Sequence, residues 1–237
     1  MSFHYSPKIV TNGLVLALDA ANKKSYPGSG TSILDLSGNS NGGVLTNGPT
    51  FDSGNGGSII FDNSNDYINV PINNNLILNS AGTIEAWVKI KNLGGSYDNT
   101  IVMKGDGASW TNLHYILFEP SGYDVMMLST SNGTSATTTA GVKTPSLSTN
   151  TWYHIVANWQ GVDFNRIYLN GELSQEKTTG IYQPKDTTAS CFFQIGRTYS
   201  NNYYFDGNIA ITKIYNRALS SQEILQNYNA TKGRFGL

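Results

Sequence analysis

Charged residues, cysteine and long apolar runs are all scarce in this 237-residue chain, and each scarcity argues against a class of protein. Charged residues make up 13% of the sequence and the formal net charge is -1, which gives no indication of a basic face for nucleic acid or a polybasic patch for a membrane. Cys191 is the only cysteine, so no disulfide can form within the chain. No apolar run approaches the ~20 residues of a membrane-spanning helix. We therefore expect neither a nucleic-acid partner nor a membrane span.

The N-terminus lacks the features of an export signal. Residues 1–8, Met-Ser-Phe-His-Tyr-Ser-Pro-Lys, contain neither the charged region nor the apolar region of a secretory signal peptide. We therefore expect the chain to fold in a cytoplasm.

Alternation of apolar and polar residues predicts β-strands along most of the chain. In residues 152–160 the apolar face of the expected strand consists of Tyr153, Ile155, Ala157 and Trp159. The segment Asn170-Gly171 then supplies, after a second strand, the two positive-φ positions of a tight hairpin turn. The most regular strand, in residues 83–91, directs to one side Ile84, Ala86, Val88 and Ile90. Strands joined by such turns indicate antiparallel sheets.

One helix is expected near the C-terminus. Ser220 and Glu223 form a capping box, with serine at the N-cap and glutamate three residues later. Leu219 and Ile224 occupy the positions of a hydrophobic staple at the same end. The pattern predicts a helix from Ser220 to about Tyr228 that packs one side against the sheets.

The chain shows no internal repeat and no linker between two cores. We divide it into an N-terminal arm (residues 1–12), one β-sandwich domain (residues 13–228) and a C-terminal tail (residues 229–237). The expected fold class is all-β, a two-sheet antiparallel jelly-roll sandwich with one short C-terminal helix. Pro7 favours an extended arm, which either pairs along its own sandwich or adds to a neighbouring subunit through main-chain hydrogen bonds.

Several segments, in the same order, resemble the laminin-G-like family of concanavalin A-like lectin/glucanase jelly rolls. They are Asp35-Leu-Ser-Gly-Asn-Ser-Asn-Gly, Ile60-Phe-Asp-Asn-Ser-Asn-Asp-Tyr-Ile, Thr83-Ile-Glu-Ala-Trp-Val-Lys, Trp152-Tyr-His-Ile-Val-Ala-Asn-Trp, Phe205-Asp-Gly-Asn-Ile and Ile214-Tyr-Asn-Arg-Ala-Leu-Ser. The similarity extends over about residues 13–228. It implies a concanavalin A-like sandwich and makes carbohydrate binding a function to consider.

The two ends of the chain resemble a narrower group, the stand-alone laminin-G-like proteins of tailed bacteriophages, notably marine T4-like phages. The similar segments are residues 3–16 and residues 229–237. Those relatives are taken to be structural or surface proteins of the virion. The resemblance implies a decoration or accessory protein of a phage particle, assembled in the host cytoplasm, with capsid or tail proteins as partners.

The sequence shows no pattern of catalytic residues. Family 16 glucanases on this fold place carboxylates on one strand face in an E-x-D-x-x-E pattern, whereas Glu85 stands alone on its strand. Glu172 and Glu176 follow a hairpin turn without a partner acid, and we interpret His154, in mid-strand, as a structural histidine. We therefore expect a non-enzymatic protein, with a glycoside hydrolase as the least favoured alternative.

Calcium is the cofactor that the sequence suggests. The candidate ligands on one loop are Asp35, Asn39 and Asn41. Their carboxylate and amide oxygens suit a hard cation, and we expect Asp62 or Asp66 to lie near them in the fold. The family often has Ile-Asp-Glu where this chain has Ile209-Ala-Ile, which removes one carboxylate. The alternative is that the loop side chains cap turns through their own hydrogen bonds.

Aromatic and amide side chains in two polar loops form a candidate glycan site. The residues are Trp110, Tyr199, Asn202 and Tyr203. Sugars stack their apolar faces on aromatic rings and direct hydroxyl groups to planar polar groups. The alternative is that these rings cover the ends of the sandwich or dock neighbouring capsid proteins. Two function hypotheses follow, and both can hold: a virion surface protein, and a lectin module that attaches to host or environmental polysaccharide.

Overall fold

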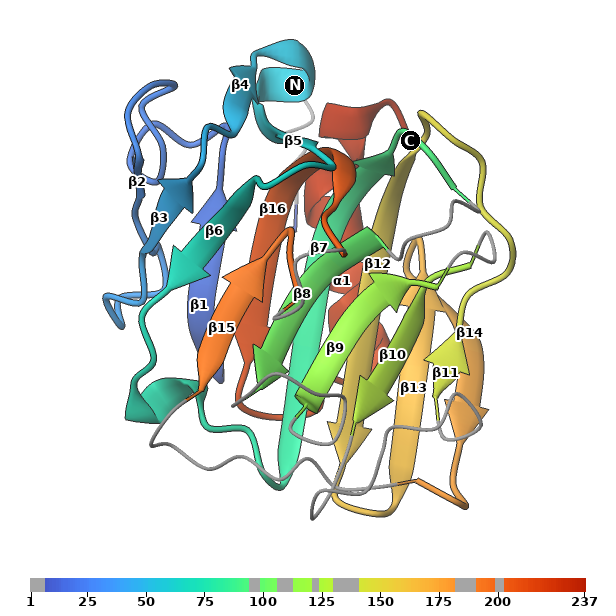
Figure 1. Ribbon diagram of the computed structural model, residues 1–237. Helices are drawn as coiled ribbons and strands as arrows, with labels where there is room; N and C mark the ends of the chain where they lie inside the picture. The colour runs from blue at the N-terminus through green and yellow to red at the C-terminus, as the bar shows by residue number, and fades with distance from the viewer. Residues whose placement is uncertain are drawn as a thin grey trace, which may run out of the picture.

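Two antiparallel sheets packed face to face form the protein (Figure 1). The computed structural model describes residues 7–93, 99–105, 113–120, 124–129, 141–181, 191–198 and 203–237. Within these ranges each sheet has eight strands, and every pair of neighbouring strands is antiparallel. The predicted all-β sandwich is therefore confirmed.

The first sheet, sheet A, has the order β14-β13-β12-β7-β16-β5-β4, and β1 also pairs with β16. Its strands are β1 (Leu14–Asp19), β4 (Thr50–Asp52), β5 (Ser58–Asp62), β7 (Ala81–Ile90), β12 (Trp152–Gln160), β13 (Phe164–Leu169), β14 (Glu172–Lys177) and β16 (Asp206–Tyr215). The second sheet, sheet B, has the order β11-β10-β9-β8-β15-β6-β3-β2. Its strands are β2 (Ser32–Ile33), β3 (Gly43–Thr46), β6 (Tyr67–Val70), β8 (Asn99–Gly105), β9 (Leu113–Glu119), β10 (Met126–Ser129), β11 (Val142–Lys143) and β15 (Phe192–Ile195).

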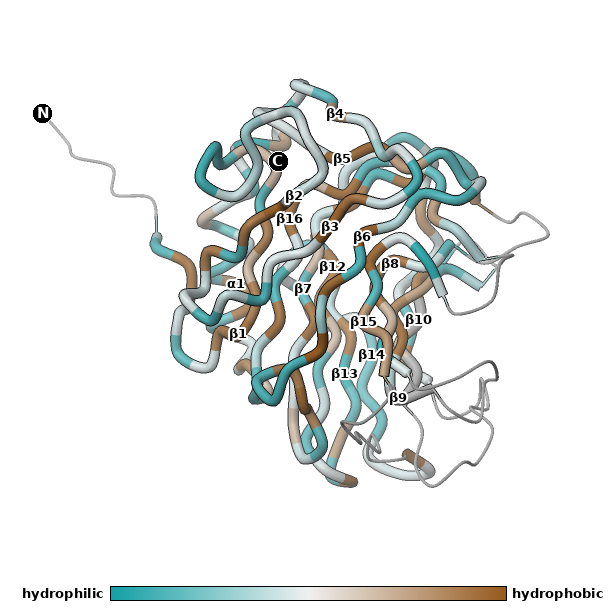
Figure 2. The backbone as a smooth tube through the Cα atoms, turned by 60° about the vertical axis from the view of Figure 1, so that its left-hand side comes forward, coloured by the Kyte–Doolittle hydropathy of each residue, from teal (hydrophilic) through white to brown (hydrophobic). Residues whose placement is uncertain are grey.

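The register between β7 and β12 explains why the alternation produces a core. Ala157 lies opposite Ile84 and Trp159 lies opposite Gly82, and both apolar side chains of β12 are fully buried between the sheets. The Trp159 ring fits only because Gly82 has no side chain, since a Cβ there would come within 2.4 Å of the ring. Apolar residues lie mostly along the strands, and the turns between the strands are mostly hydrophilic (Figure 2).

The predicted hairpin turn is also present, between β13 and β14. Asn170 and Gly171 have φ values of 52° and 84°, the positive values that such a turn requires.

The helix α1 (Ser221–Thr231) and the 3₁₀ turn η5 (Lys232–Phe235) pack on the outer face of sheet A (Figure 1). The predicted capping box is confirmed, because Glu223 N–H donates to Ser220 Oγ (3.2 Å) and Ser220 N–H donates to Glu223 Oε2 (2.9 Å). The helix ends at Thr231 rather than near Tyr228, and the residues expected as a tail continue onto the sheet. No helix in the described ranges has both the length and the apolar character that crossing a membrane requires.

The ring of Phe235 holds this C-terminal segment in place. Its centroid lies 4.0 Å from that of Trp87, with the rings nearly parallel, and 4.8 Å from that of Trp152. Trp87 is fully buried, and its Nε1 donates a hydrogen bond to Thr231 Oγ1 (2.9 Å). The segment is therefore not a free tail, because it covers tryptophans that the outer face of sheet A would otherwise expose.

A buried polar cluster lies under α1. Its members are Glu85, His154, Lys213, Tyr215 and Asn227. Lys213 Nζ donates to Glu85 Oε1 (2.6 Å), and Asn227 Nδ2 donates to Glu85 Oε2 (2.6 Å). Burial alone raises the pKa of Glu85, but the Lys213 ammonium and His154, whose Nε2 lies 3.1 Å from Oε1, together lower it to about 2. The carboxylate therefore stays ionised and connects β7, β16 and α1.

The end of the N-terminal arm is bound to the same face of its own sandwich. Val10 N–H donates to Asn227 Oδ1 (2.7 Å), and Tyr215 Oη donates to the Val10 carbonyl (3.1 Å). Val10 is buried, and Gln226 Nε2 donates to the Lys8 carbonyl (2.6 Å). Phe3 and Tyr5, which belong to the same predicted arm, lie outside the described residues.

We expect Phe235→Ala to destabilise the protein by about 3–5 kcal/mol, because it leaves a cavity between two tryptophans. The midpoint of urea unfolding measures the loss. Leu237→Ala is the matched control, since Leu237 is 47% exposed and its truncation should change stability by less than ~0.5 kcal/mol. Equal midpoints for the two variants would show that the aromatic stack does not hold the segment.

We expect Glu85→Gln to lower stability at neutral pH by about 3–5 kcal/mol, because it leaves Lys213 buried without a counter-charge. The pKa of Glu85 falls from 4.5 to about 2 on folding, so its contribution is complete above pH 4.5 and is lost as the pH drops towards 2. Unfolding free energies measured from pH 7 to pH 2 should therefore fall less steeply in the variant than in the wild type. Glu172→Gln, at an exposed position on β14, should retain the wild-type slope.

Candidate functional site

Of the four predicted glycan residues, the structure describes only Tyr203. Trp110, Tyr199 and Asn202 lie outside the described residues. Tyr203 is half-buried, and its carbonyl accepts a hydrogen bond from Thr198 N–H (3.2 Å). The next residue, Tyr204, pairs with Arg197, whose guanidinium lies 5.6 Å from the Tyr204 ring centroid and 4.7 Å from that of Tyr67. The glycan site in these loops stays a prediction.

The structure brings the three predicted calcium ligands together on one loop beside β1. Asp35 Oδ1 accepts from Ala17 N–H (2.8 Å) and Ser37 N–H (2.8 Å), and Oδ2 accepts from Ser37 Oγ (2.7 Å) and Asn41 N–H (3.0 Å). Asn41 Nδ2 donates to the Val15 carbonyl (2.7 Å). Both carboxylate oxygens thus accept protein donors, as in the turn-capping alternative.

The amide oxygens of the same loop also accept hydrogen bonds. Asn73 Nδ2 donates to Asn41 Oδ1, and Asn75 Nδ2 donates to Asn39 Oδ1 (3.4 Å). The described ranges contain no group of three or more His, Cys, Asp or Glu side chains that could hold a metal ion. Calcium binding at this loop therefore stays a prediction, and an ion would have to displace donors that are already bound.

Asp62 is the last residue of β5, and Asp66 lies on the turn before β6. Asp62 Oδ1 accepts from Ser64 N–H (2.9 Å) and from Asn65 N–H (3.4 Å). Burial, followed by the negative charge of Asp62, raises the pKa of Asp66 to about 6. No hydrogen bond between described residues connects this turn to Asp35.

Two of the described glutamates, Glu85 and Glu119, are buried, and two others, Glu176 and Glu223, pair with arginines. Glu85 is fully buried beneath α1 and paired with Lys213, so a substrate cannot reach it. Glu119 is also buried, where its Oε2 accepts from Asn99 Nδ2 (2.9 Å), and Glu176 on the edge strand pairs with Arg166. The sequence showed Glu85 alone on its strand because its partners come from three other elements. His154 is buried beside it.

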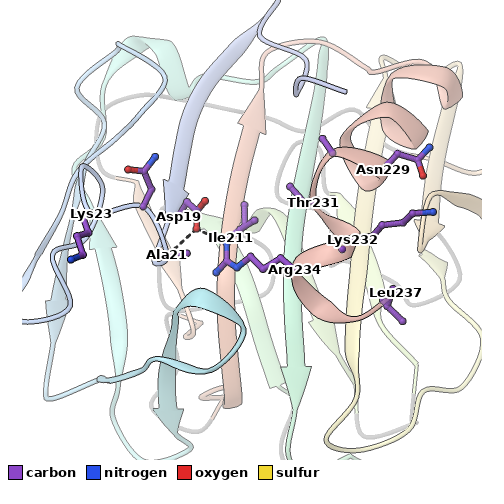
Figure 3. A pocket seen from close by; sticks show the side chains of 12 residues that line it. Asp19, Ala21, Lys23, Ile211, Asn229, Thr231, Lys232, Arg234 and Leu237 are labelled. Carbon is purple, nitrogen blue, oxygen red and sulfur yellow. Dashed lines mark hydrogen bonds and ion pairs between the residues drawn. The ribbon is translucent and has the colours of Figure 1, made fainter. Parts of the chain in front are cut away.

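An open groove of about 790 Å³ lies between the turn that follows β1 and the C-terminal part of α1 with η5 (Figure 3). Its volume is in the range typical of small-molecule sites, ~300–1,000 Å³. The polar side chains that line it include Asp19, Asn22, Lys23, Asn229, Lys232 and Arg234. None of the residues predicted as glycan or metal ligands belongs to this lining.

An ion pair joins the two walls of the groove. Figure 3 shows Arg234 reaching from η5 towards Asp19 at the end of β1, and its Nη1 donates to Asp19 Oδ1 (2.7 Å). Arg234 Nε also donates to the Asn55 carbonyl (2.5 Å), and its Nη2 donates to the Gly57 carbonyl. The guanidinium is thus fixed by three acceptors before any ligand binds.

The two lysines of the groove stand on different walls, Lys23 on the turn after β1 and Lys232 at the start of η5. Neither forms an ion pair with a carboxylate in the described part of the chain. Lys232 Nζ instead lies 5.2 Å from the centroid of the Tyr228 ring. The amides of Asn22 and Asn229 add hydrogen-bonding groups to the same walls.

Sequence reasoning missed the groove because its walls come from opposite ends of the chain. The first wall lies in residues 19–23 and the second in residues 229–237, which we expected to be a tail. The clustered basic residues of both segments were visible in the sequence, but only the docking of η5 brings them together.

Comparison with known proteins identifies the superfamily of the chain. The sequence matches the family model of the concanavalin A-like lectin/glucanases superfamily over residues 62–225. A search of curated protein sequences finds no match.

Solved structures with low sequence identity share the fold. The receptor-binding domain of botulinum neurotoxin C/D mosaic serotype aligns with a TM-score of 0.69 at 18% identity, covering 92% of this chain and 51% of that one. The binding domain of Paraclostridial Mosquitocidal Protein 1 aligns with a TM-score of 0.70 at 19% identity, covering 93% and 52%. The ligand-binding domain of botulinum neurotoxin serotype D, in complex with N-acetylneuraminic acid, aligns with a TM-score of 0.69 at 19% identity, covering 92% and 51%.

The chain therefore spans about half the length of these toxin domains. Because the family model covers most of the strands of both sheets, the chain belongs to the concanavalin A-like lectin/glucanases superfamily.

Proposed function

We propose that the protein is a non-catalytic module that binds polysaccharide, and that it does so as a surface subunit of a bacteriophage particle. The observation that carries the binding function is the open groove, whose amides, carboxylate and guanidinium suit the hydroxyl groups of a sugar. The loops that contain Trp110, Tyr199, Asn202 and Tyr203 are a second candidate surface for the same function.

The lectin-like fold supports this proposal. The superfamily includes lectins, and one of the similar toxin domains was crystallised with N-acetylneuraminic acid. Carbohydrate is therefore the ligand class to test first. Glu85 and Glu119 are fully buried and cannot face a glycosidic bond, which favours binding over hydrolysis because glycosidases need two carboxylates facing the bond that they cleave.

The resemblance of the chain ends to phage proteins supports the virion role. Both ends are also integral to the fold, because Val10 and Phe235 pack on the same outer face of sheet A. The partners in this role are other capsid or tail proteins, and assembly takes place in the host cytoplasm.

We expect the purified protein to bind at least one polysaccharide on a glycan array and Ala230→Trp to abolish that binding. Ala230 lines the groove, is half-buried and does not belong to the buried core, so a large ring there blocks the groove. Gln222→Trp, at an exposed position of the same helix outside the groove, is the control.

The predicted loop is tested by Tyr203→Ala. Arrays run in calcium and in EDTA test the predicted ion, since a loop that binds calcium should support binding only in calcium.

The absence of binding across charged and neutral glycans would leave only a structural role. Binding that Tyr203→Ala removes and Ala230→Trp does not would move the site from the groove to the predicted loop.

We expect mass spectrometry to detect the chain in washed particles of the phage that encodes it. Its absence from such particles would contradict the virion role.

A deletion of residues 2–6 then tests the arm as an anchor, because it leaves the contacts of Lys8 and Val10 in place. Folded protein that no longer enters particles would identify the arm as the anchor, and wild-type incorporation would exclude it.

A further inference from the structure

We infer that the groove between β1 and η5 selects acidic saccharides, which carry carboxylate or sulfate groups, over neutral ones. This inference rests on the glycan binding proposed above and specifies its ligand class. It depends on three features of the groove: the balance of its charges, the state of Arg234 and the absence of aromatic side chains from its described lining.

The charges of the groove do not balance locally. Asp19 is the acidic side chain of its lining, and it is already paired with Arg234 (2.7 Å). Lys23 and Lys232 have no such partner among the described carboxylates. The ammonium groups of Lys23 and Lys232 thus flank the groove as an excess of positive charge, and Figure 3 shows both extending away from the Asp19–Arg234 pair. An excess of one sign of charge around a concave surface raises the local concentration of ligands of the opposite sign.

Arg234 is held in one orientation before any ligand binds. Its three acceptors, Asp19 and the carbonyls of Asn55 and Gly57, hold the guanidinium in one orientation. The guanidinium has five N–H donors and uses three of them here, so two remain for a further acceptor. Because the orientation is set before binding, little side-chain entropy is lost when an anion arrives.

The described lining contains no aromatic side chain, so stacking cannot supply the binding energy. A neutral sugar in this groove would exchange hydrogen bonds with water for hydrogen bonds with Asn22, Asn229 and Asp19, with little net gain. An acidic sugar makes the same bonds and adds charge-assisted ones, which are stronger. The groove therefore discriminates by charge.

The test is calorimetric titration with oligosaccharides that differ only in charge. Oligogalacturonate is compared with its fully methyl-esterified form, and sulfated carrageenan oligomers are compared with their desulfated forms. We expect the wild-type protein to prefer the acidic member of at least one pair, with an affinity that falls as salt rises. Lys23→Gln and Lys232→Gln should each weaken acidic binding by about two- to fivefold and leave neutral binding unchanged.

Lys24→Gln is the matched control. Lys24 is exposed, adjacent to Lys23 and carries the same charge, but it does not line the groove, so its loss should leave the affinity at the wild-type level. Circular dichroism melts of the three variants should coincide with the wild type, since all three positions lie outside the buried clusters.

The possible results separate this inference from the proposed function. Equal binding of acidic and neutral members, or equal effects of Lys23→Gln and Lys24→Gln, would overturn the selection for acidic saccharides while glycan binding remained. Failure to bind any oligosaccharide would overturn both proposals. Binding of a single-stranded oligonucleotide as tight as that of the acidic sugars would show a general polyanion site and would also overturn the selection for saccharides.

Discussion

The buried ion pair of Glu85 and Lys213 is the interaction on which the outer face of sheet A depends. A carboxylate moved from water into an apolar interior is strongly disfavoured unless a counter-charge and hydrogen bonds replace the water. Lys213 supplies the charge from within the sheet, but the second oxygen finds its donor, Asn227, only on α1. Asn227 also accepts a hydrogen bond from Val10 N–H. The buried polar groups of the helix, the sheet and the end of the arm therefore find their hydrogen-bond partners only when all three segments are docked.

The docking of α1 has a consequence beyond stability. It carries η5 onto the sheet, where Phe235 covers Trp87 and Trp152, and it brings Arg234 within reach of Asp19. The groove is the space that remains between this segment and the turn after β1. The site therefore exists only in the fully docked state, and any ligand that binds there stabilises the docking by mass action.

The sequence predicted the features that depend on neighbouring residues. The capping box needs only Ser220 and Glu223, and the strand faces need only the alternation of residues such as Ile84 and Ala86. The Glu85 cluster could not be predicted because its members are far apart in the chain and meet only through the register of β7, β12 and β16. The helix was predicted too short for a related reason. Its last turn is stabilised by Trp87, which donates to Thr231 from another element, and not by a local stop signal.

The net charge of the chain does not indicate the positive charge beside the groove. A net charge of -1 averages over ion pairs that are neutral as units, among them Arg166 with Glu176 and Arg217 with Glu223. Such pairs contribute little to the field beyond a Debye length, ~8 Å at physiological ionic strength. Unpaired charges dominate at that range, and in the groove these belong to Lys23 and Lys232. A chain that is nearly neutral as a whole can therefore present a locally cationic groove, because the potential that a ligand meets depends on which charges are left without partners.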